Sequence, residues 1–418
     1  MRPIVLVAAK QSYRVGDFID AASLLRMEPV VASDADTFFD QSGRHVSIDL
    51  DDPVASATHI AATVPEAIGV LAVDDQGVVI AALAAAKLGV PHNSHEAAAA
   101  TRDKHVMRNL LLDREVRQPR FLAAGPGEVS KKAADIGYPA VVKPVGLSAS
   151  RGVIRVDGPA AAQRAEIRVR EILAAAGRGA NEPLLVEEYI PGVEVAVEGL
   201  LVEGDLEVLA FIDKPEPLEG PYFEETLYVT PSRLPAVILE RVERLAGDAV
   251  GALGLSVGPV HTEIRIPSDG NPVLIEVAAR TIGGLCGRAL SFGLVSESLE
   301  VLAVRAAAGM PSPMTDAAKP ASGVLMLPIP ATGLLTEIVG LEEARSVRGV
   351  DNIEITIPIG RSVVALPEGD RYLGFVFASA ADAAQVEEIL RRAGAALTVV
   401  IDGEDVRPPI SASSPLPG

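Results

Sequence analysis

Two glutamates that face each other across a predicted hairpin constrain the fold of this chain most strongly. β-Branched residues flank the polar cluster 268–271 (SDGN), which is typical of a hairpin turn. A four-residue loop places Pro267 opposite Pro272 and therefore Glu263 opposite Glu276. Because alternate side chains of a strand share a face, both carboxylates are expected to project from one side of a sheet.

Like charges in this position destabilise a strand pair, so the sequence either gives up stability here or holds a cation between the two carboxylates. Mg²⁺ takes one or two carboxylates together with nucleotide phosphate oxygens. Arg280 follows Glu276 by four residues, precedes Gly283 and Gly284, and is suited to grip a carboxylate or phosphate with two hydrogen bonds. The alternative is a solvated hairpin whose register differs by one residue.

Length and composition indicate a multidomain globular protein. The 418 residues allow two to four domains, and no run approaches the ~20 apolar residues of a membrane span. The first residues, MRPIVLVAAKQ, have too short an apolar run for a signal peptide and predict a strand. The single cysteine, Cys286, rules out an intramolecular disulfide and fits a reducing cytoplasm.

The charge balance argues against two classes of partner. A formal charge of −19 disfavours nucleic acid and anionic membranes, and the absence of tryptophan leaves few platforms on which bases could stack. An acidic protein that handles phosphate must place its cations locally, so isolated lysines become informative.

Strand and helix signals alternate through residues 1–95. Strands are expected at 4–7, 27–32 and 68–73, with helices at 18–25 and 78–88. This alternation predicts a parallel, doubly wound sheet, and the G-x-G-x-x-G dinucleotide fingerprint does not follow its first strand. Asp74 and Asp75 follow a strand end, where ligands gather in such sheets, although capping of the next helix explains them at least as well.

A lysine and a loop of small residues form the second candidate site. Ser94 is expected to cap a helix through Leu112 that carries Asp103 and Lys104. Further on, an apolar strand ends in Lys143. The loop that follows contains Gly146, Ser148, Ser150 and Gly152, and its backbone N–H groups can approach phosphate oxygens closely. It is not a Walker motif, and a flexible turn is the alternative.

The next segment predicts a strand at 184–190 and an amphipathic strand that contains Glu194. Glu194 is a candidate acceptor for ribose hydroxyls, or simply part of a wet strand face. Residues 215–232 lack periodicity and predict an irregular loop at the border of a cleft. A well-patterned helix is expected at 236–253.

The C-terminal part predicts a smaller α+β domain. The expected domains are 1–95, 96–310 and 311–403, followed by a disordered tail at 404–418 that is rich in proline and serine towards its end.

This order of motifs resembles the ATP-grasp superfamily over roughly residues 1–402. The resemblance implies a Rossmann-like domain followed by two α+β subdomains that hold ATP between them. It also implies roles for individual residues: Lys104 and Lys143 on the phosphates, Gly146–Gly152 as a mobile loop over them, Glu187, Tyr189 and Ile190 at the adenine, Glu194 on the ribose, and Glu263 and Glu276 on Mg²⁺, for which Mn²⁺ can substitute.

Finer details resemble the L-amino acid ligases (dipeptide synthetases) and carnosine-synthase-like enzymes. These include Tyr13-Arg14, Asp213-Lys214 and the Arg371–Val376 stretch. Two positions depart from the pattern. Ala278 stands where many members have asparagine, and Tyr228 stands where related ligases often have histidine.

The resemblance implies an ATP-dependent carboxylate–amine ligase that forms a dipeptide-type amide through an acyl phosphate. The partners would be an amino acid or other carboxylate and an amine. The protein is expected to be cytoplasmic, and a homodimer is a candidate assembly. Arg280 would position the acid substrate or the tetrahedral oxyanion, and Lys143 would spread phosphoryl charge. His261 faces the same way as Glu263 and is either a functional residue or core packing.

Two other functions remain open at this point. One is an ATP-grasp carboxylase or purine-type formate or bicarbonate ligase. The other is a nucleotide-binding protein without turnover, which the loss of asparagine at Ala278 would favour.

Overall fold

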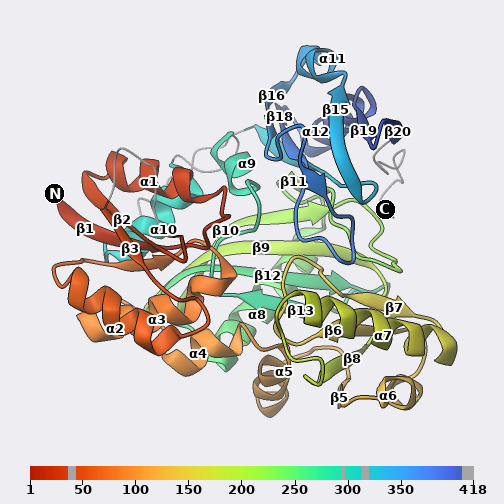
Figure 1. The fold of residues 1–418 in the computed structure, drawn as a ribbon, viewed down its shortest axis with the longest axis horizontal. Helices are drawn as coiled ribbons and strands as arrows, with labels where there is room; N and C mark the ends of the chain where they lie inside the picture. The colour runs from red at the N-terminus through yellow and green to blue at the C-terminus, as the bar shows by residue number, and fades with distance from the viewer. Residues whose placement is uncertain (36–43, 293–296, 312–319, 407–418) are drawn as a thin grey trace.

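The N-terminal part of the molecule is a parallel sheet flanked by helices (Figure 1). The computed structural model describes residues 1–35, 44–292, 297–311 and 320–406. The sheet has the order β3-β2-β1-β4, and all its pairs are parallel, as predicted for this region. Its strands are β1 (Arg2–Val7), β2 (Met27–Ser33), β3 (Arg44–Ser47) and β4 (Val70–Ala72). Its helices are α1 (Val15–Leu24), α2 (Pro53–Thr63) and α3 (Val78–Leu88), and the short 3₁₀ helix η1 (Asp75–Gly77) precedes α3.

The helix predicted from Ser94 to Leu112 is in fact two helices, α4 (His95–Ala100) and α5 (Lys104–Asp113). Ser94 caps the first, as expected. The Asp103 carboxylate accepts hydrogen bonds from the backbone N–H groups of His105 and Val106 and so starts a second helix. An aspartate that bonds to the backbone in this way competes with helix continuation. The break places Lys104 in the first turn of α5.

A four-stranded antiparallel sheet with the order β5-β8-β6-β7 carries the lysine strand and the small-residue loop. Its strands are β5 (Phe121–Ala124), β6 (Ala140–Pro144), β7 (Ile154–Val156) and β8 (Leu184–Glu188). Helices α6 (Val129–Ile136) and α7 (Pro159–Ala175) pack against it through their apolar faces.

An eight-stranded antiparallel sheet with the order β13-β12-β9-β10-β11-β14-β18-β16 runs through the centre of the molecule. Its strands are β9 (Val193–Val202), β10 (Asp205–Lys214), β11 (Leu227–Thr230), β12 (Gly258–Ile266), β13 (Val273–Ala278), β14 (Ala321–Leu327), β16 (Val350–Ile355) and β18 (Gly374–Ala380). Strand β11 lies inside 215–232, so the prediction of a wholly irregular loop there is wrong. Its four residues are all buried.

The C-terminal region shares this central sheet through β14, β18 and β16, and it adds a second sheet, β17-β15-β19-β20. The strands of that sheet are β15 (Gly333–Val339), β17 (Ser362–Val363), β19 (Thr398–Ile401) and β20 (Glu404–Val406). Residues 404–406 are therefore ordered, in contrast to the predicted tail, because β20 pairs with β19. Residues 407–418 lie outside the described part. The predicted domain boundaries remain predictions.

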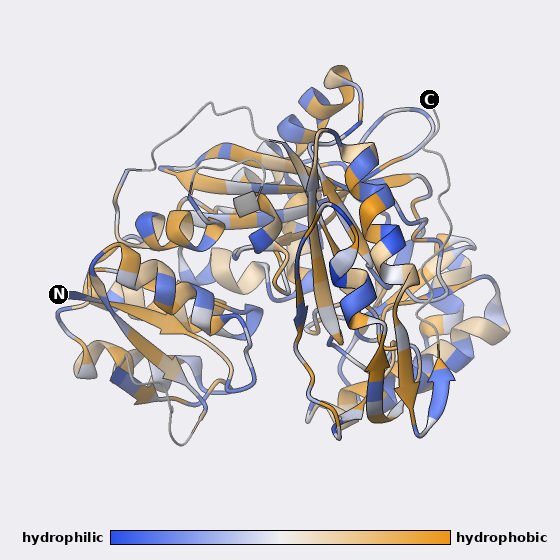
Figure 2. Ribbon diagram, turned by 90° about the horizontal axis from the view of Figure 1, so that it is seen from above, coloured by the Kyte–Doolittle hydropathy of each residue, from blue (hydrophilic) through white to orange (hydrophobic). Residues whose placement is uncertain are grey.

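Helices complete the layers around the central sheet. They are α8 (Ala236–Leu253), α9 (Gly287–Phe292), α10 (Leu299–Ala307), α11 (Leu341–Ser346) and α12 (Ala383–Ala395). Figure 2 shows mostly apolar strands next to helices in which polar and apolar residues alternate. Helix α10 packs with α1 in one apolar core, which ties the N-terminal sheet to the rest of the chain. Among the described residues, no helix has the length and apolarity to cross a membrane.

The turn before β9 depends on Gly192, and this dependence is testable. Gly192 has φ +111°, and a Cβ there would lie 2.1 Å from the Ile266 carbonyl oxygen. Gly127 is a matched control, with φ +80° and no atom within 4 Å of the place that a Cβ would occupy. Gly127→Ala should cost about 1–2 kcal/mol from the left-handed backbone alone. Gly192→Ala should cost about 1–3 kcal/mol more because of the clash.

Thermal unfolding of both variants checks this prediction. A Gly192→Ala protein that melts at or above the temperature of Gly127→Ala would contradict the close approach of the two chain segments.

Candidate active site

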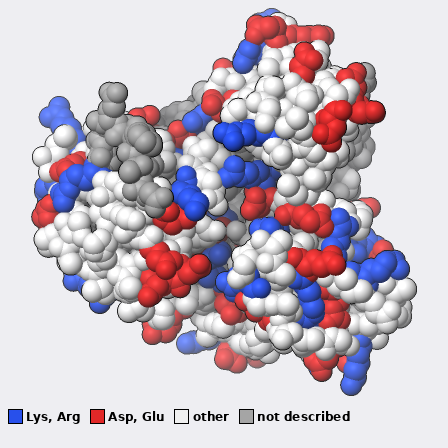
Figure 3. All heavy atoms as spheres, in the orientation of Figure 1, with Lys and Arg blue, Asp and Glu red and all other residues white. Residues whose placement is uncertain are grey.

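A cleft of about 360 Å³ lies where the N-terminal sheet, the small-residue loop and the C-terminal region meet. It is lined by parts of the segments 9–14, 147–150, 187–190, 275–286 and 370–372, among others. Figure 3 shows basic and acidic side chains intermixed around the hollow in the middle of this face. Residues far apart in the sequence therefore converge on one site.

The floor of the cleft is a row of paired charges across three strands. Glu194 on β9 is directly opposite Lys214 on β10 and Arg265 on β12. The Lys214 ammonium lies 2.7 Å from one Glu194 oxygen, and the Arg265 Nε donates to the other at 2.7 Å. All three side chains are buried, and opposite charges in direct cross-strand pairs stabilise a sheet.

A second row contains His261. Glu198 on β9 faces His261, which in turn faces Ala278 on β13. The His261 Nδ1 lies 2.9 Å from Glu198, and its Nε2 lies 3.6 Å from Glu263. Burial opposes a charge on this imidazole, but bonding to Glu198 and Glu263 outweighs it and raises the pKa of His261 to about 9. His261 therefore lies at the site and carries a positive charge at neutral pH.

The pairing of Glu263 with Glu276 is confirmed, although the register that predicted it is not. The four-residue loop would pair Arg265 with Leu274, whereas the structure pairs Arg265 with Val273. A β-bulge at Ile275 absorbs the one-residue difference before the glutamates are reached. The backbone carbonyl of Ile275 in this bulge accepts a hydrogen bond from the Arg108 guanidinium at 2.6 Å.

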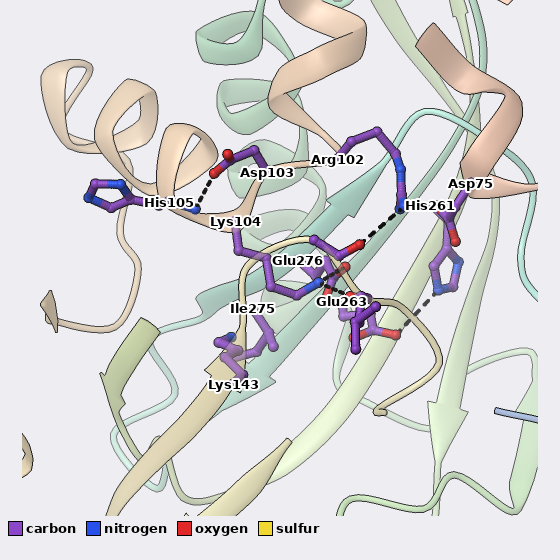
Figure 4. A network of polar contacts seen from close by, with 12 residues as sticks. Asp75, Arg102, Asp103, Lys104, His105, Lys143, His261, Glu263, Ile275 and Glu276 are labelled. Atoms are coloured by element: carbon purple, nitrogen blue, oxygen red, sulfur yellow. Dashed lines mark hydrogen bonds and ion pairs between the residues drawn. The ribbon is translucent and has the colours of Figure 1, made fainter. Parts of the chain in front are cut away.

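Each glutamate of the pair has its own lysine. Lys104 lies 3.1 Å from Glu276 (Figure 4), and Lys214 lies 3.1 Å from Glu263. Lys214 also contacts Glu225, and the oxygens of Glu194, Glu225 and Glu263 lie within 4.8 Å of one another. Burial opposes its charge, yet the three carboxylates hold the pKa of Lys214 well above its ordinary value. Like-charge repulsion is thus offset by ammonium groups from other elements.

Lys143 and Glu187 form the buried wall of the same end of the cleft. Lys143 lies 2.5 Å from Glu187, which also pairs with Arg108 at 2.6 Å. Burial would raise the pKa of Glu187, but Arg108 and Lys143 lower it to about 2. Burial lowers the pKa of Lys143, although Glu187 opposes this shift. The carboxylate predicted to meet adenine is therefore bound to two basic side chains.

Tyr189 and Ile190, which were predicted to meet the adenine, line the cleft. The Tyr189 ring stacks on Phe223 with ring centroids 6.3 Å apart. These side chains give the cleft an apolar wall next to the Lys143–Glu187 pair.

The small-residue loop is only partly open to the cleft. Ser148 and Ser150 line it, whereas Gly146 and Gly152 do not. The Gly152 N–H is bonded to the Pro367 carbonyl at 2.9 Å and is not free for a phosphate. Lys104 donates to the Leu147 carbonyl at 2.8 Å, so lysine and loop are tied together.

Arg280 connects the site to the N-terminal sheet. Its guanidinium lies 3.0 Å from Asp75, which also pairs with Arg102 at 3.4 Å. Burial would raise the pKa of Asp75, but the two guanidinium groups hold it well below its usual range. The capping alternative for Asp74 is not supported, because Asp74 precedes η1 without a side-chain capping bond.

Several residues of the site had no role in it from the sequence: Arg108, Glu198, Glu225 and Arg265, whereas Asp75 and Lys214 were noted there without a defined role. Strand and helix periodicity could have placed two of these residues at the site. Arg265 shares a strand face with Glu263, and Arg108 lies one helical turn after Lys104. Glu225 had no such signal because it lies outside a regular element.

The other end of the cleft is more aromatic. It contains Tyr13, Tyr228, Tyr372, Met326 and Cys286. The Tyr228 hydroxyl donates to Glu225 at 2.5 Å. Burial raises the pKa of the Cys286 thiol, which therefore stays protonated and behaves as an apolar contact.

Two family models match parts of the chain. Residues 136–289 match the ATP-grasp domain, and residues 325–402 match the L-amino acid ligase C-terminal domain 2. The structure is similar to that of an L-amino acid ligase from Bacillus licheniformis, with a TM-score of 0.79, 24% identity, and coverage of 96% of this chain and 99% of that one. The predicted fold class, an ATP-grasp fold with mixed helices and sheets, is confirmed.

Two relatives are similar in sequence. Alanine–anticapsin ligase of Bacillus subtilis (strain 168) is 29% identical over 219 residues, which cover 48% of this chain and 46% of that protein. D-Alanine–D-alanine ligase of Cupriavidus pinatubonensis is 28% identical over 214 residues, which cover 49% of this chain and 62% of that protein. The chain thus matches less than two-thirds of the length of each of these relatives.

Glu224 provides a stability test in the loop that borders the cleft. Burial raises the pKa of Glu224 to about 7 from 4.5. Its stabilising contribution is therefore fully present below pH 4.5 and is lost as the pH rises through 7. Glu224→Gln should match the wild type in Tm near pH 4, exceed it progressively up to pH 7, and keep a constant advantage above about pH 8.

Glu219→Gln, at an exposed position of the same loop, is the control and should show no such trend. Melting curves of Glu224→Gln that differ from the wild type by the same amount at every pH would rule out a buried, protonated Glu224.

Proposed function

Because the chain joins an ATP-grasp domain to an L-amino acid ligase C-terminal domain, we propose that it is an ATP-dependent carboxylate–amine ligase. It would form an amide bond of the dipeptide type and release ADP and phosphate. The observation that carries this proposal is the Glu263–Glu276 pair, held beside Lys104 at the end of the cleft that also contains Lys143 and Arg280.

The donor set fits a hard divalent cation. Glu263 and Glu276 are directly opposite each other, their side chains are 22% and 28% exposed, and both line the cleft. Carboxylate oxygens in such a place suit Mg²⁺ or Mn²⁺ that arrives with phosphate oxygens. When bound, the ion would supply neutralising charge on the phosphates. Ala278 offers no ligand atom, so water would complete the coordination.

The nucleotide would lie between the two α+β parts. Lys104 and Lys143 would contact its phosphates, with Ser148 and Ser150 above them as hydrogen-bond donors. Tyr189 and Ile190 would meet the adenine, and Glu194 would accept from the ribose through lone pairs that Lys214 and Arg265 leave free. Lysines already paired with carboxylates are held in position before ATP enters.

The first chemical step would be phosphoryl transfer. A carboxylate oxygen of the acid substrate attacks the γ-phosphorus, the bond from phosphorus to the bridging oxygen breaks, and ADP leaves. This step converts an unreactive carboxylate into an acyl phosphate with a good leaving group. Lys104 and Lys143 stabilise the charge of the transferring group, the largest contribution in such reactions.

The second step would be amide formation. The amine nitrogen attacks the acyl carbon, and the tetrahedral intermediate expels phosphate as the nitrogen loses a proton. Arg280, fixed by Asp75, would hold the substrate carboxyl group and then the oxyanion. His261, oriented by Glu198, would add positive charge on the same side.

One observation favours a second candidate function. Ala278 offers no side-chain metal ligand, which is the change expected of a nucleotide-binding protein without turnover.

ADP release separates the two functions. Purified protein mixed with ATP, Mg²⁺ and pairs of amino acids should release ADP for at least one pair. Mass spectrometry should then identify an amide product, whereas a carboxylated product would indicate the carboxylase class instead.

Glu276→Ala should abolish ADP formation. The carboxylate has a direct role beside Lys104, and its loss should lower the rate by more than about 100-fold. The measurement is ADP release, with Glu240→Ala on the exposed face of α8 as the control. Activity within about tenfold of the wild type would remove Glu276 from the site.

Arg280→Met should impair turnover far more than nucleotide binding. We expect kcat to fall by about 100- to 1,000-fold while the Kd for ATP changes by less than about threefold. Calorimetric titration with ATP and steady-state kinetics provide the two values, and Arg244→Met on α8 is the control. Equal losses in both would instead make Arg280 a nucleotide ligand.

We also propose that the protein works in the cytoplasm. A single buried thiol without a disulfide partner suits a reducing cytoplasm. The homodimer expected from the family resemblance remains a prediction.

A further inference from the structure

In the part of the chain that the structure describes, lysine and arginine side chains line the cleft at six positions, and all but one are paired. These positions are Arg14, Lys104, Lys143, Arg265, Arg280 and Arg371. The first five each have a carboxylate of this chain within 4.0 Å. Arg371 has no such partner among the described residues. Among these six side chains it is therefore the one whose charge no carboxylate of the described residues offsets.

Arg371 stands at the aromatic end of the cleft. Its neighbour Tyr372 is partly buried there, and Tyr13 lines the cleft together with both residues. The guanidinium donates a long hydrogen bond, 3.4 Å, to the Gln11 carbonyl. A guanidinium has five N–H donors in a planar fork that matches a carboxylate, so most of this capacity is unused.

The backbone around Arg371 is anchored on both sides. Upstream, the Pro367 carbonyl accepts from Gly152, and Glu368 pairs with Arg168 at 2.6 and 3.0 Å. Downstream, the Leu373 N–H donates to the Leu327 carbonyl at 2.9 Å. An exposed arginine on a fixed segment is a positioned donor rather than a freely moving surface charge.

We propose that Arg371 binds the carboxylate of the amine-donating substrate, so that the second substrate is an amino acid and the product a dipeptide. This inference rests on the proposed ligase function. It adds the residue that would select an amine carrying a carboxylate over one that lacks it.

The chemistry of the reaction favours this carboxylate over the other anions. The carboxylate of the acid substrate must lie at the γ-phosphate and loses its charge when it becomes an acyl phosphate. The phosphates would be contacted by Lys104 on α5 and Lys143 on β6. The carboxylate of the amine donor keeps its charge throughout the reaction and therefore needs a cation that stays beside it. The acidic lining of the cleft would otherwise repel it.

The test compares two amine donors that differ only in the carboxylate. With the acid substrate fixed at saturation, L-alanine and L-alaninamide serve as donors, and ADP release is measured. Arg371→Met keeps the apolar stem and removes the charge. It should raise the KM for L-alanine by about 10- to 100-fold with kcat within about threefold. The KM for L-alaninamide should not change.

Matched variants sharpen the result. Arg371→Lys should restore part of the affinity for L-alanine, because it keeps the charge but loses the two-pronged geometry. Arg345→Met, at an exposed position of α11, should behave as the wild type. Equal effects on both donors, or a raised KM for ATP, would overturn the proposal, the latter making Arg371 a phosphate ligand.

A binding measurement distinguishes failure of this proposal from failure of the ligase function. In the presence of a non-hydrolysable ATP analogue, L-alanine should raise the Tm of the wild type and not that of Arg371→Met. If the wild type binds L-alanine through Arg371 but releases no ADP with any acid, the ligase function fails and the carboxylate site stands. If ADP is released and Arg371→Met retains the wild-type KM for L-alanine, the carboxylate site fails alone.

Discussion

Charge pairing across the β10-β9-β12 face is the interaction on which the site depends. Buried carboxylates such as Glu194 and Glu198 are costly unless they are bonded, and each has a cation in the directly opposite position of a neighbouring strand. Lys214 and Arg265 neutralise Glu194, and His261 neutralises Glu198. The sheet thus holds a polar floor in place within an apolar framework.

Ion pairs also join the separate parts of the molecule. Arg280 on the hairpin side meets Asp75 after the N-terminal sheet, while Arg151 in the small-residue loop lies 3.8 Å from Asp370 of the C-terminal region. Arg108 ties α5 both to Glu187 and to the bulge beside Glu276. Ion pairs between parts allow each part to keep its own apolar core and still share one cleft. The site therefore exists only when all of these parts are assembled.

The sequence predicted several strands, helices and the glutamate pair correctly. It did not predict the bulge beside that pair, strand β11 or the hydrogen bond made by Gly152. The parallel N-terminal sheet, α3, α8 and the Glu263–Glu276 pair follow from periodicity and turn composition, which are local properties. The one-residue bulge at Ile275 was missed because turn composition does not reveal it, and its carbonyl meets Arg108, which is far away in the sequence. Strand β11 was missed because a segment of four buried residues shows no pattern until neighbouring strands cover it. Gly152 was assigned to phosphate binding, but its N–H is taken by Pro367.

By itself, the sequence determined which residue types alternate on each strand, and hence that Glu263, His261 and Arg265 share a face. It also determined the acidic net charge of −19, which makes single lysines informative about where phosphate could bind. Only the tertiary structure decided which charges meet, because the pairs Lys104–Glu276, Arg280–Asp75 and Lys143–Glu187 join residues between 44 and more than 200 positions apart. Such distant pairing is set by how sheets pack and strands order themselves. The same packing leaves Arg371 without a carboxylate partner of its own chain in the described structure.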